Sequence, residues 1–205
     1  MGWAPDYVTT GELAAYTRIG DSVDDAQIGL AIAAASRAID QATGRQFGLL
    51  DAAAARYFTA RWDSRECQWV VPCDDLMTTT DLSVAVDTVG EGDYDGVLTG
   101  VVPCPRNAVG TGRPWTELRV TRGVSVQPAG IADGVRVTAR WGWSTVPDAI
   151  KQATLLQASR LLSRRDSPYG IAGSAELGSE MRLLARLDAD VAVAVRPYRR
   201  VWGAV

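Results

Sequence analysis

Hydrophobic and polar positions alternate at helical spacing between residues 9 and 44. Thr9 and Glu12 have the spacing of a capping box, which predicts a short helix that ends near Thr17. A second helix is predicted over 22–42, with Asp21 or Ser22 as its cap, acidic residues in its first turn and Gly44 after its end. Its apolar stripe consists of Ile28, Ile32, Ala35 and Ile39.

Alanine lies on every side of this second helix, which favours close approach of other chains on more than one face. An ordinary core helix with high helix propensity explains the same composition. Under the first interpretation, Ala34 and Ala38 are candidates for contact with a neighbouring subunit.

Residues 55–145 consist of short β-prone runs that are separated by turn signals. This pattern predicts an antiparallel sheet that is folded as a small sandwich or barrel. The stretch 103–114 is predicted to be a long loop. Trp62, Trp69 and Trp115 are expected as large core or interface residues. The strand candidates are 55–60, 67–72, 82–87, 94–102, 115–122 and 134–141.

A third helix is predicted over 147–165, with Pro147 at its first position. Its apolar residues fall into two arcs, whereas a surface helix needs only one. We therefore expect the helix to be covered on two sides, and its second arc to face a neighbouring subunit. That arc consists of Leu155, Ala158 and Leu162.

The segment 166–187 contains Gly170, Gly173 and Gly178, and its second half from Met181 is predicted to be extended. An ordinary surface loop is the alternative. Asp188 is expected to cap a short helix over 189–196, and Pro197 then directs the chain into an extended tail.

The tail, 197–205, contains residue types that dominate protein interfaces. We expect it to dock on another protein, and a disordered terminus is the alternative. The docking candidates are Tyr198, Arg199, Arg200, Val201 and Trp202.

The composition and the charge of the chain limit the classes of function that it can have. The net charge of −3 is too small to favour nucleic-acid binding by bulk electrostatics. Residues 1–55 carry seven acids and three arginines, and residues 160–205 carry eight arginines and five acids, so opposite-signed ends could help like subunits pack. No membrane span and no secretory signal is expected.

No histidine occurs, which removes most nucleophilic and zinc mechanisms. Three cysteines, Cys67, Cys73 and Cys104, are expected to be reduced and mostly buried thiols of a cytoplasmic protein. Glu91, Asp93 and Asp95 alternate as in part of a calcium loop, but no glutamate follows at the twelfth position, so a turn between strands is favoured. We therefore expect no enzyme, no metal and no cofactor.

Three stretches together resemble the head-tail connector (head-completion adaptor) proteins of long-tailed double-stranded DNA bacteriophages. The resemblance covers roughly residues 7–47 and 134–200, as several weak motifs in the right order. About 90 residues intervene where smaller members have a short β segment. The stretches are "YVTTGELAAYTRIGDSVDDAQIGLAIAAASRAIDQATGRQF", "VRVTARWGWSTVPDAIKQATLLQASRLLSRRDSPYGIAG" and "RLDADVAVAVRPYRR".

This resemblance implies a structural virion protein that forms a twelve-subunit ring at the head-tail interface and is assembled in the host cytoplasm. The ring would bind the portal protein and a tail-side connector, stopper or tail terminator, with the major capsid protein as a further candidate partner. DNA would pass through its channel without sequence-specific binding. Residues 166–187, with Gly170, Gly173, Gly178 and Met181, are expected towards the channel, and the tail on the portal.

The expected fold class is α+β, with a helical body and a large antiparallel β insert. We divide the chain into the first part of the body (1–54), the insert (55–133), the second part of the body (134–196) and the docking tail (197–205). The rival interpretation is a monomeric or dimeric cytoplasmic β-rich domain that binds a ligand or peptide.

Overall fold

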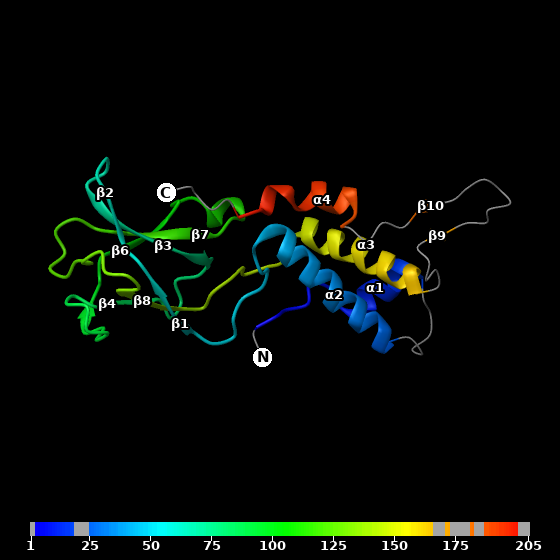
Figure 1. Ribbon diagram of the computed structural model, residues 1–205, viewed down its shortest axis with the longest axis horizontal. Coiled ribbons are helices and arrows are strands. Elements are labelled where there is room, and N and C mark those ends of the chain that lie inside the picture. Colours follow the sequence, from blue (N-terminus) through cyan, green and yellow to red (C-terminus); the bar gives the residue numbers. More distant parts are fainter. Residues whose placement is uncertain (1–2, 19–24, 166–170, 173–180, 183–186, 201–205) are drawn as a thin grey trace. The chain divides into compact units, whose positions relative to one another are not determined.

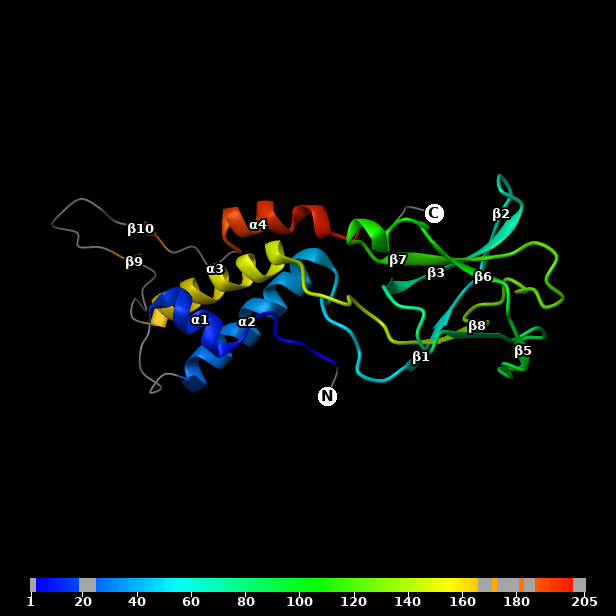
Figure 2. The same ribbon diagram turned by 180° about the vertical axis from the view of Figure 1, so that it is seen from behind.

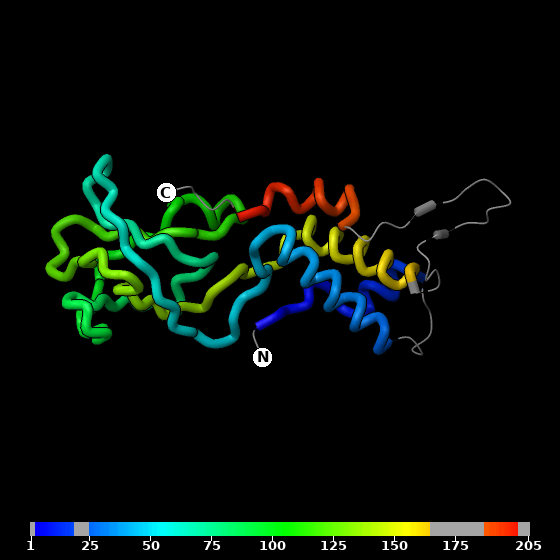
Figure 3. The backbone as a smooth tube through the Cα atoms, in the orientation of Figure 1, coloured from blue at the N-terminus to red at the C-terminus, as the bar shows by residue number. Residues whose placement is uncertain are grey.

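The computed structural model describes residues 3–18, 25–165, 171–172, 181–182 and 187–200. The chain divides into two compact units, which are treated separately below. The helical unit is formed by Met1–Phe47 and Val146–Val205, and the β unit by Gly48–Thr145. The tube in Figure 3 traces the chain from the helical unit through the β unit and back. The mixed class predicted from the sequence, helices with a β-rich part, is confirmed.

Four α-helices form the helical unit. They are α1 (Thr10–Thr17), α2 (Asp25–Thr43), α3 (Asp148–Arg165) and α4 (Ala189–Val195), and the 3-10 turn η3 (Arg196–Tyr198) continues α4. Helices α2 and α3 lie side by side, with α4 along one side of this pair and α1 along the other (Figures 1 and 2). Two short strands, β9 (Ile171–Ala172) and β10 (Met181–Arg182), pair antiparallel.

Local signals set the N-terminus of α1 and the C-terminus of α2 as predicted, whereas the candidate caps Asp21 and Ser22 lie outside the described residues. The Thr9 hydroxyl accepts a hydrogen bond from the Glu12 backbone N–H at 3.2 Å, and the Glu12 carboxylate accepts one from the Thr9 N–H at 2.6 Å. This is the predicted capping box. Gly44, with φ of +65°, follows the last residue of α2 in the left-handed conformation that glycine adopts most readily.

The core of the helical unit is made where α1, α2 and α3 meet. Ile28, Ile32 and Ala35 of α2 are buried there, as their helical spacing predicted. Val8, Leu13, Ala31 and Ala158 complete the buried cluster, and Leu155, Leu161 and Leu162 pack against it.

The β unit contains two four-stranded antiparallel sheets, in the orders β1-β8-β4-β5 and β2-β3-β7-β6. The strands are β1 (Ala54–Phe58), β2 (Arg61–Asp63), β3 (Gln68–Leu76), β4 (Ser83–Val86), β5 (Gly96–Val97), β6 (Val101–Cys104), β7 (Trp115–Val120) and β8 (Val135–Ala139), with a 3-10 turn η1 (Val109–Thr111).

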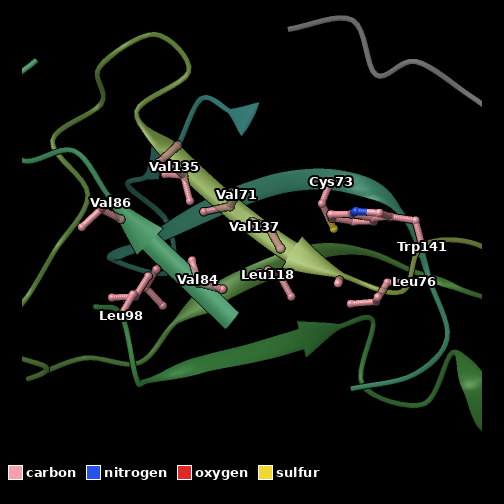
Figure 4. Packing of buried hydrophobic residues seen from close by; sticks show 13 residues of the cluster. Val71, Cys73, Leu76, Val84, Val86, Leu98, Leu118, Val135, Val137 and Trp141 are labelled. Atoms are coloured by element: carbon pink, nitrogen blue, oxygen red, sulfur yellow. The ribbon is translucent and has the colours of Figure 1, made fainter. Parts of the chain in front are cut away.

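The two sheets enclose a separate hydrophobic core (Figure 4). Val71 and Leu118 of one sheet and Val84 and Val137 of the other are buried in it. This is the sandwich arrangement that the alternating strands predicted. Trp141 packs at the end of the cluster and donates from Nε1 to the Ala54 carbonyl at 2.7 Å.

Three expectations about the β region were wrong in detail. The run 94–102, predicted as one strand, forms β5 and β6 in different sheets. A Cβ at Gly100 would lie 2.3 Å from Val124 Cγ1, so the chain passes between the sheets at a residue that has no side chain. The predicted loop 103–114 begins within β6 and contains the turn η1.

Strand β8 belongs to the β unit, whereas we had assigned residues from 134 onward to the helical body. It pairs with β1 from Val135 to Ala139 and with β4 from Val135 to Thr138, so it is a central strand of its sheet. The sequence boundary failed because strand pairing connects segments that are far apart along the chain.

Of the three tryptophans expected in the core or at an interface, Trp69 and Trp115 are partly buried against the core. Trp62 is 53% exposed, so it is not a core residue and its interface role stays a prediction. Among the described residues, the fully buried tryptophans are Trp141 and Trp143, and Trp143 donates from Nε1 to Asp75 at 2.8 Å.

Candidate assembly surfaces

The C-terminal helix is fixed to the helical unit by one carboxylate. The Asp188 side chain accepts a hydrogen bond from the Asp190 N–H at 2.8 Å and so caps α4 as predicted. The same carboxylate forms an ion pair with Arg160 of α3, and the Asp188 N–H donates to Gln157 at 3.3 Å. Val191 and Val195 point into the unit and are buried.

The predicted extended tail is wrong over its first residues, because the chain folds back on α2. After α4 it forms the turn η3, and Arg199, which follows this turn, is extended. The Arg200 N–H donates to the Thr43 carbonyl at 2.7 Å, and Arg45 Nε donates to the Tyr198 carbonyl at 2.8 Å. Pro197 ends the α-helix as expected, but a 3-10 turn accommodates it.

Of the five docking candidates, Arg199 is exposed, Tyr198 and Arg200 are half-buried against the chain's own residues, and Val201 and Trp202 lie outside the described residues. The structure therefore gives the start of the tail a fixed point of departure, next to the C-terminal end of α2.

Phe47 lies at the centre of the cluster that receives this segment. Its ring meets Tyr7 edge to face at 5.6 Å and Tyr198 at 5.8 Å. The Tyr7 hydroxyl donates to Asp40 and accepts from the Phe47 N–H. Burial raises the pKa of Tyr7, and the hydrogen bond to Asp40 adds to this rise.

The outer face of α2 carries mostly uncharged side chains. Ala34 is exposed, Ala38 is half-buried, and Leu30, one turn before Ala34, is 72% exposed. Gln27 and Gln41 lie on the same face at helical spacing, and Arg37 at its border is half-buried and paired with Asp40. This is the face that the alanine pattern singled out.

The second arc of α3 is partly covered within the chain. Ala158 is fully buried in the core of the helical unit, and Leu155 and Leu162 pack against that core. Helix α3 contacts α1, α2 and α4, which explains why its apolar residues form two arcs. Ala158 is therefore a core residue, whereas Leu155 and Leu162 are only partly buried, and their contact with a neighbouring subunit stays a prediction.

The candidate channel segment is only partly described. Met181 pairs with Ala172 in the β9–β10 ladder, so its extended conformation is confirmed and its partner strand lies in the same segment. Gly170, Gly173 and Gly178 lie outside the described residues.

A groove of about 450 Å³ opens on the helical unit beside α1. Its walls are the N-terminal segment, α1, α2 and the start of α3, and Asp6 and Glu12 contribute negative charge. The backbone N–H of Thr9, which donates to Glu12, lowers the pKa of that carboxyl. Lys151 supplies one positive charge, and Gly29 and Ile32 form an apolar floor.

In contrast to this groove, the outer face of α4 exposes an apolar side chain and, beyond it, two arginines. Val193 is 71% exposed and lies opposite the buried Val191 and Val195. Arg196 is exposed on the same side, and Arg199 is exposed one turn further on.

A second, larger groove of about 770 Å³ lies on the β unit beside Arg106, Arg119 and Arg122. Arg119 pairs there with Glu66 and with Glu117, the latter at 2.8 Å. The positive charge of Arg119 is thus balanced within the protein.

The acidic stretch 90–96 forms the predicted turn, and the residue that organises it was missed. The Asp87 carboxylate accepts hydrogen bonds from the N–H groups of Gly90 and Gly92, both at 2.7 Å, and of Val89 at 3.1 Å. These hydrogen bonds, that from Gly90 most, lower the pKa of Asp87. Glu91, Asp93 and Asp95 are exposed around the turn.

Within the described parts of the chain, no three or more Cys, Asp or Glu side chains gather where they could hold a metal ion. Cys73 and Cys104 are buried, and Cys67 is exposed. None of the described helices combines the length and the apolar character that a membrane span requires.

No protein-family model and no curated protein matches the chain. Among solved structures, a chain of the "Neck of empty GTA particle computed with C6 symmetry" has a similar fold, with a TM-score of 0.54 and 21% sequence identity. The superposition covers 100% of this chain and 96% of that chain. The β unit is therefore part of the shared architecture, and the chain has the fold of a subunit found in a particle neck.

Proposed function

We propose that this protein is a subunit of a head-to-tail adaptor ring in a phage-like particle. The observation that carries the proposal is the fold shared over the whole chain with a component of a GTA particle neck, GTA being a phage-like gene transfer agent. The sequence stretches that resemble connector proteins support the same role, and they do so independently of the fold comparison. The protein would act as a structural component and not as an enzyme.

The ring would contain twelve copies and lie between the portal and the tail, where it continues the DNA channel. The sixfold symmetry of the related neck is compatible with six or twelve copies of each subunit. A closed ring requires a heterologous interface, in which one face of the subunit meets a different face of the next. The mostly uncharged outer face of α2, with Ala34 and Ala38, is one surface that we assign to this contact.

The C-terminal residues would bind the portal protein. Because Tyr198 and Arg200 hold the end of the chain at the base of α2, residues 201–205 would start from a defined place on each subunit. Twelve copies would then present twelve such ends to one partner, which multiplies a weak contact into stable attachment. The segment 166–187 would line or face the channel, and a tail-side connector, stopper or tail terminator would bind the opposite side of the ring.

Deleting the gene in the strain that produces the particle tests the proposal. An adaptor is needed after DNA packaging and before tail attachment, so the deletion should give separate heads and tails and no joined particles in electron micrographs. Expression of the protein from a plasmid should restore joined particles. Normal tailed particles without the protein would contradict the proposed role.

A further inference from the structure

We infer that the outer face of α4 of one subunit docks into the groove beside α1 of the next copy in the ring. This inference rests on the proposed ring and specifies which two surfaces meet. Both surfaces belong to the helical unit, so their relation within one subunit is defined.

The first surface is the exposed Val193 of α4, with one acidic residue, Asp190, on its N-terminal side and two arginines on its C-terminal side. Val193 exposes 71% of its surface at the middle of α4, and Arg196 and Arg199 are exposed towards its C-terminal end. In the described part of the chain, neither arginine side chain forms an ion pair. Helix α4 is held rigidly from behind by the buried valines and by the pair of Asp188 with Arg160.

The second surface is concave and carries the opposite charge. The groove of about 450 Å³ has Asp6 and Glu12 on its walls against one positive charge, Lys151, and Gly29 and Ile32 form its apolar floor. A Cβ placed on Gly29 would meet nothing within 4 Å, so the floor is open to an incoming side chain at this position.

The positions of the two surfaces fit a head-to-side contact. Helices α1 and α4 lie along different sides of the α2–α3 pair (Figures 1 and 2), so one subunit can use both surfaces at once with two neighbours. Burying Val193 against the floor at Gly29 would supply apolar contact, and the arginines opposite Asp6 and Glu12 would fix orientation. The occupant of the groove is therefore a second copy of this chain.

Cross-linking between single-cysteine variants tests the contact directly. The background is Cys67→Ser, because Cys67 is the exposed thiol while Cys73 and Cys104 are buried. Val193→Cys and Asp6→Cys are prepared as separate proteins with different mass tags, mixed at high concentration and treated with a short bismaleimide. We expect a cross-linked species that contains both tags. The control replaces Asp6→Cys by Arg65→Cys, an exposed position in the β unit, and should give none.

A charge exchange tests the same contact without a reagent. Arg196→Glu and Asp6→Arg should each lower the association constant about tenfold, since each places like charges in the contact. The double variant should recover most of the loss, and circular dichroism should show that all three are folded. If the double variant associates as weakly as the single variants do, the proposed pairing of Arg196 with Asp6 is contradicted.

The docking surfaces and the proposed ring can be contradicted separately. If the wild-type chain forms rings but Val193 and Asp6 do not cross-link, the docking surfaces are wrong and the ring stands. If the wild-type chain fails to associate at any concentration, alone or with its portal, the proposed function fails with them.

Discussion

Phe47 and Tyr198 meet edge to face, with ring centroids 5.8 Å apart and an interplanar angle of 83°. This contact joins the end of the N-terminal part of the helical unit to the turn that follows α4. Together with the hydrogen bonds of Arg45 and Arg200, it holds the residues from η3 to Arg200 against the helical unit. The contribution of the aromatic pair can be tested.

Tyr198→Ala should lower the free energy of unfolding by about 1–3 kcal/mol, because it removes a half-buried ring from the cluster around Phe47. It should also increase amide hydrogen exchange in α4. The control is Tyr57→Ala, whose side chain is 52% exposed in the β unit. Exchange in α4 that is unchanged in Tyr198→Ala would show that the valines alone hold the helix.

Tyr7→Phe should reduce stability by about 1–2 kcal/mol at neutral pH, because it removes the hydrogen bonds with Asp40 and the Phe47 N–H. The pKa of Tyr7 is raised above its ordinary value of 10.0 in the folded protein. The stability that this shift contributes is complete below about pH 10 and is lost as the pH rises towards the folded pKa. The difference between wild type and variant should therefore shrink above about pH 10.

Urea unfolding at a series of alkaline pH values measures this difference. Tyr57→Phe, at an exposed position, serves as the matched control. A constant difference between wild type and Tyr7→Phe across the alkaline range would contradict the inferred shift.

Asp188→Ala should destabilise the helical unit by about 1–2 kcal/mol, since it removes both the cap of α4 and the partner of Arg160. Asp188→Asn keeps an oxygen that can cap and loses the charge, so its cost should be smaller. Thermal unfolding of the two variants separates the contributions. Equal losses in both would mean that the ion pair matters more than the cap.

The β unit should fold without the rest of the chain when its boundaries are those of the structure. Residues 48–145 contain β8, which supplies Val135, Val137 and Ala139 to the core, and should unfold cooperatively in urea. Residues 55–133 lack that central strand and should not. Cooperative unfolding of the shorter fragment would show that β8 is dispensable.

Local chemistry made part of this structure predictable. The capping box of Thr9 and Glu12 and the cap at Asp188 depend on residues two or three positions apart, and both were identified from the sequence. The stripe of Ile28 and Ile32 likewise gave the buried face of α2, because helical spacing alone defines it.

Contacts between segments that lie far apart along the chain could not be predicted from the sequence pattern. The place of β8 depends on pairing with β1 and β4, and the fold-back of Tyr198 depends on Phe47, which lies in the other half of the helical unit. The two arcs of α3 were recognised, but intrachain partners bury Ala158 where a neighbouring subunit had been expected. Periodicity shows that a face is covered and does not identify what covers it.

The central claim, that this chain builds an adaptor ring, is tested most directly by native mass spectrometry and electron microscopy of the purified protein, alone and mixed with the portal protein of the same particle. The account predicts a closed ring of twelve subunits, alone or on the portal, with a central opening in class averages. A chain that stays monomeric or dimeric under both conditions, at concentrations up to its solubility limit, would contradict it.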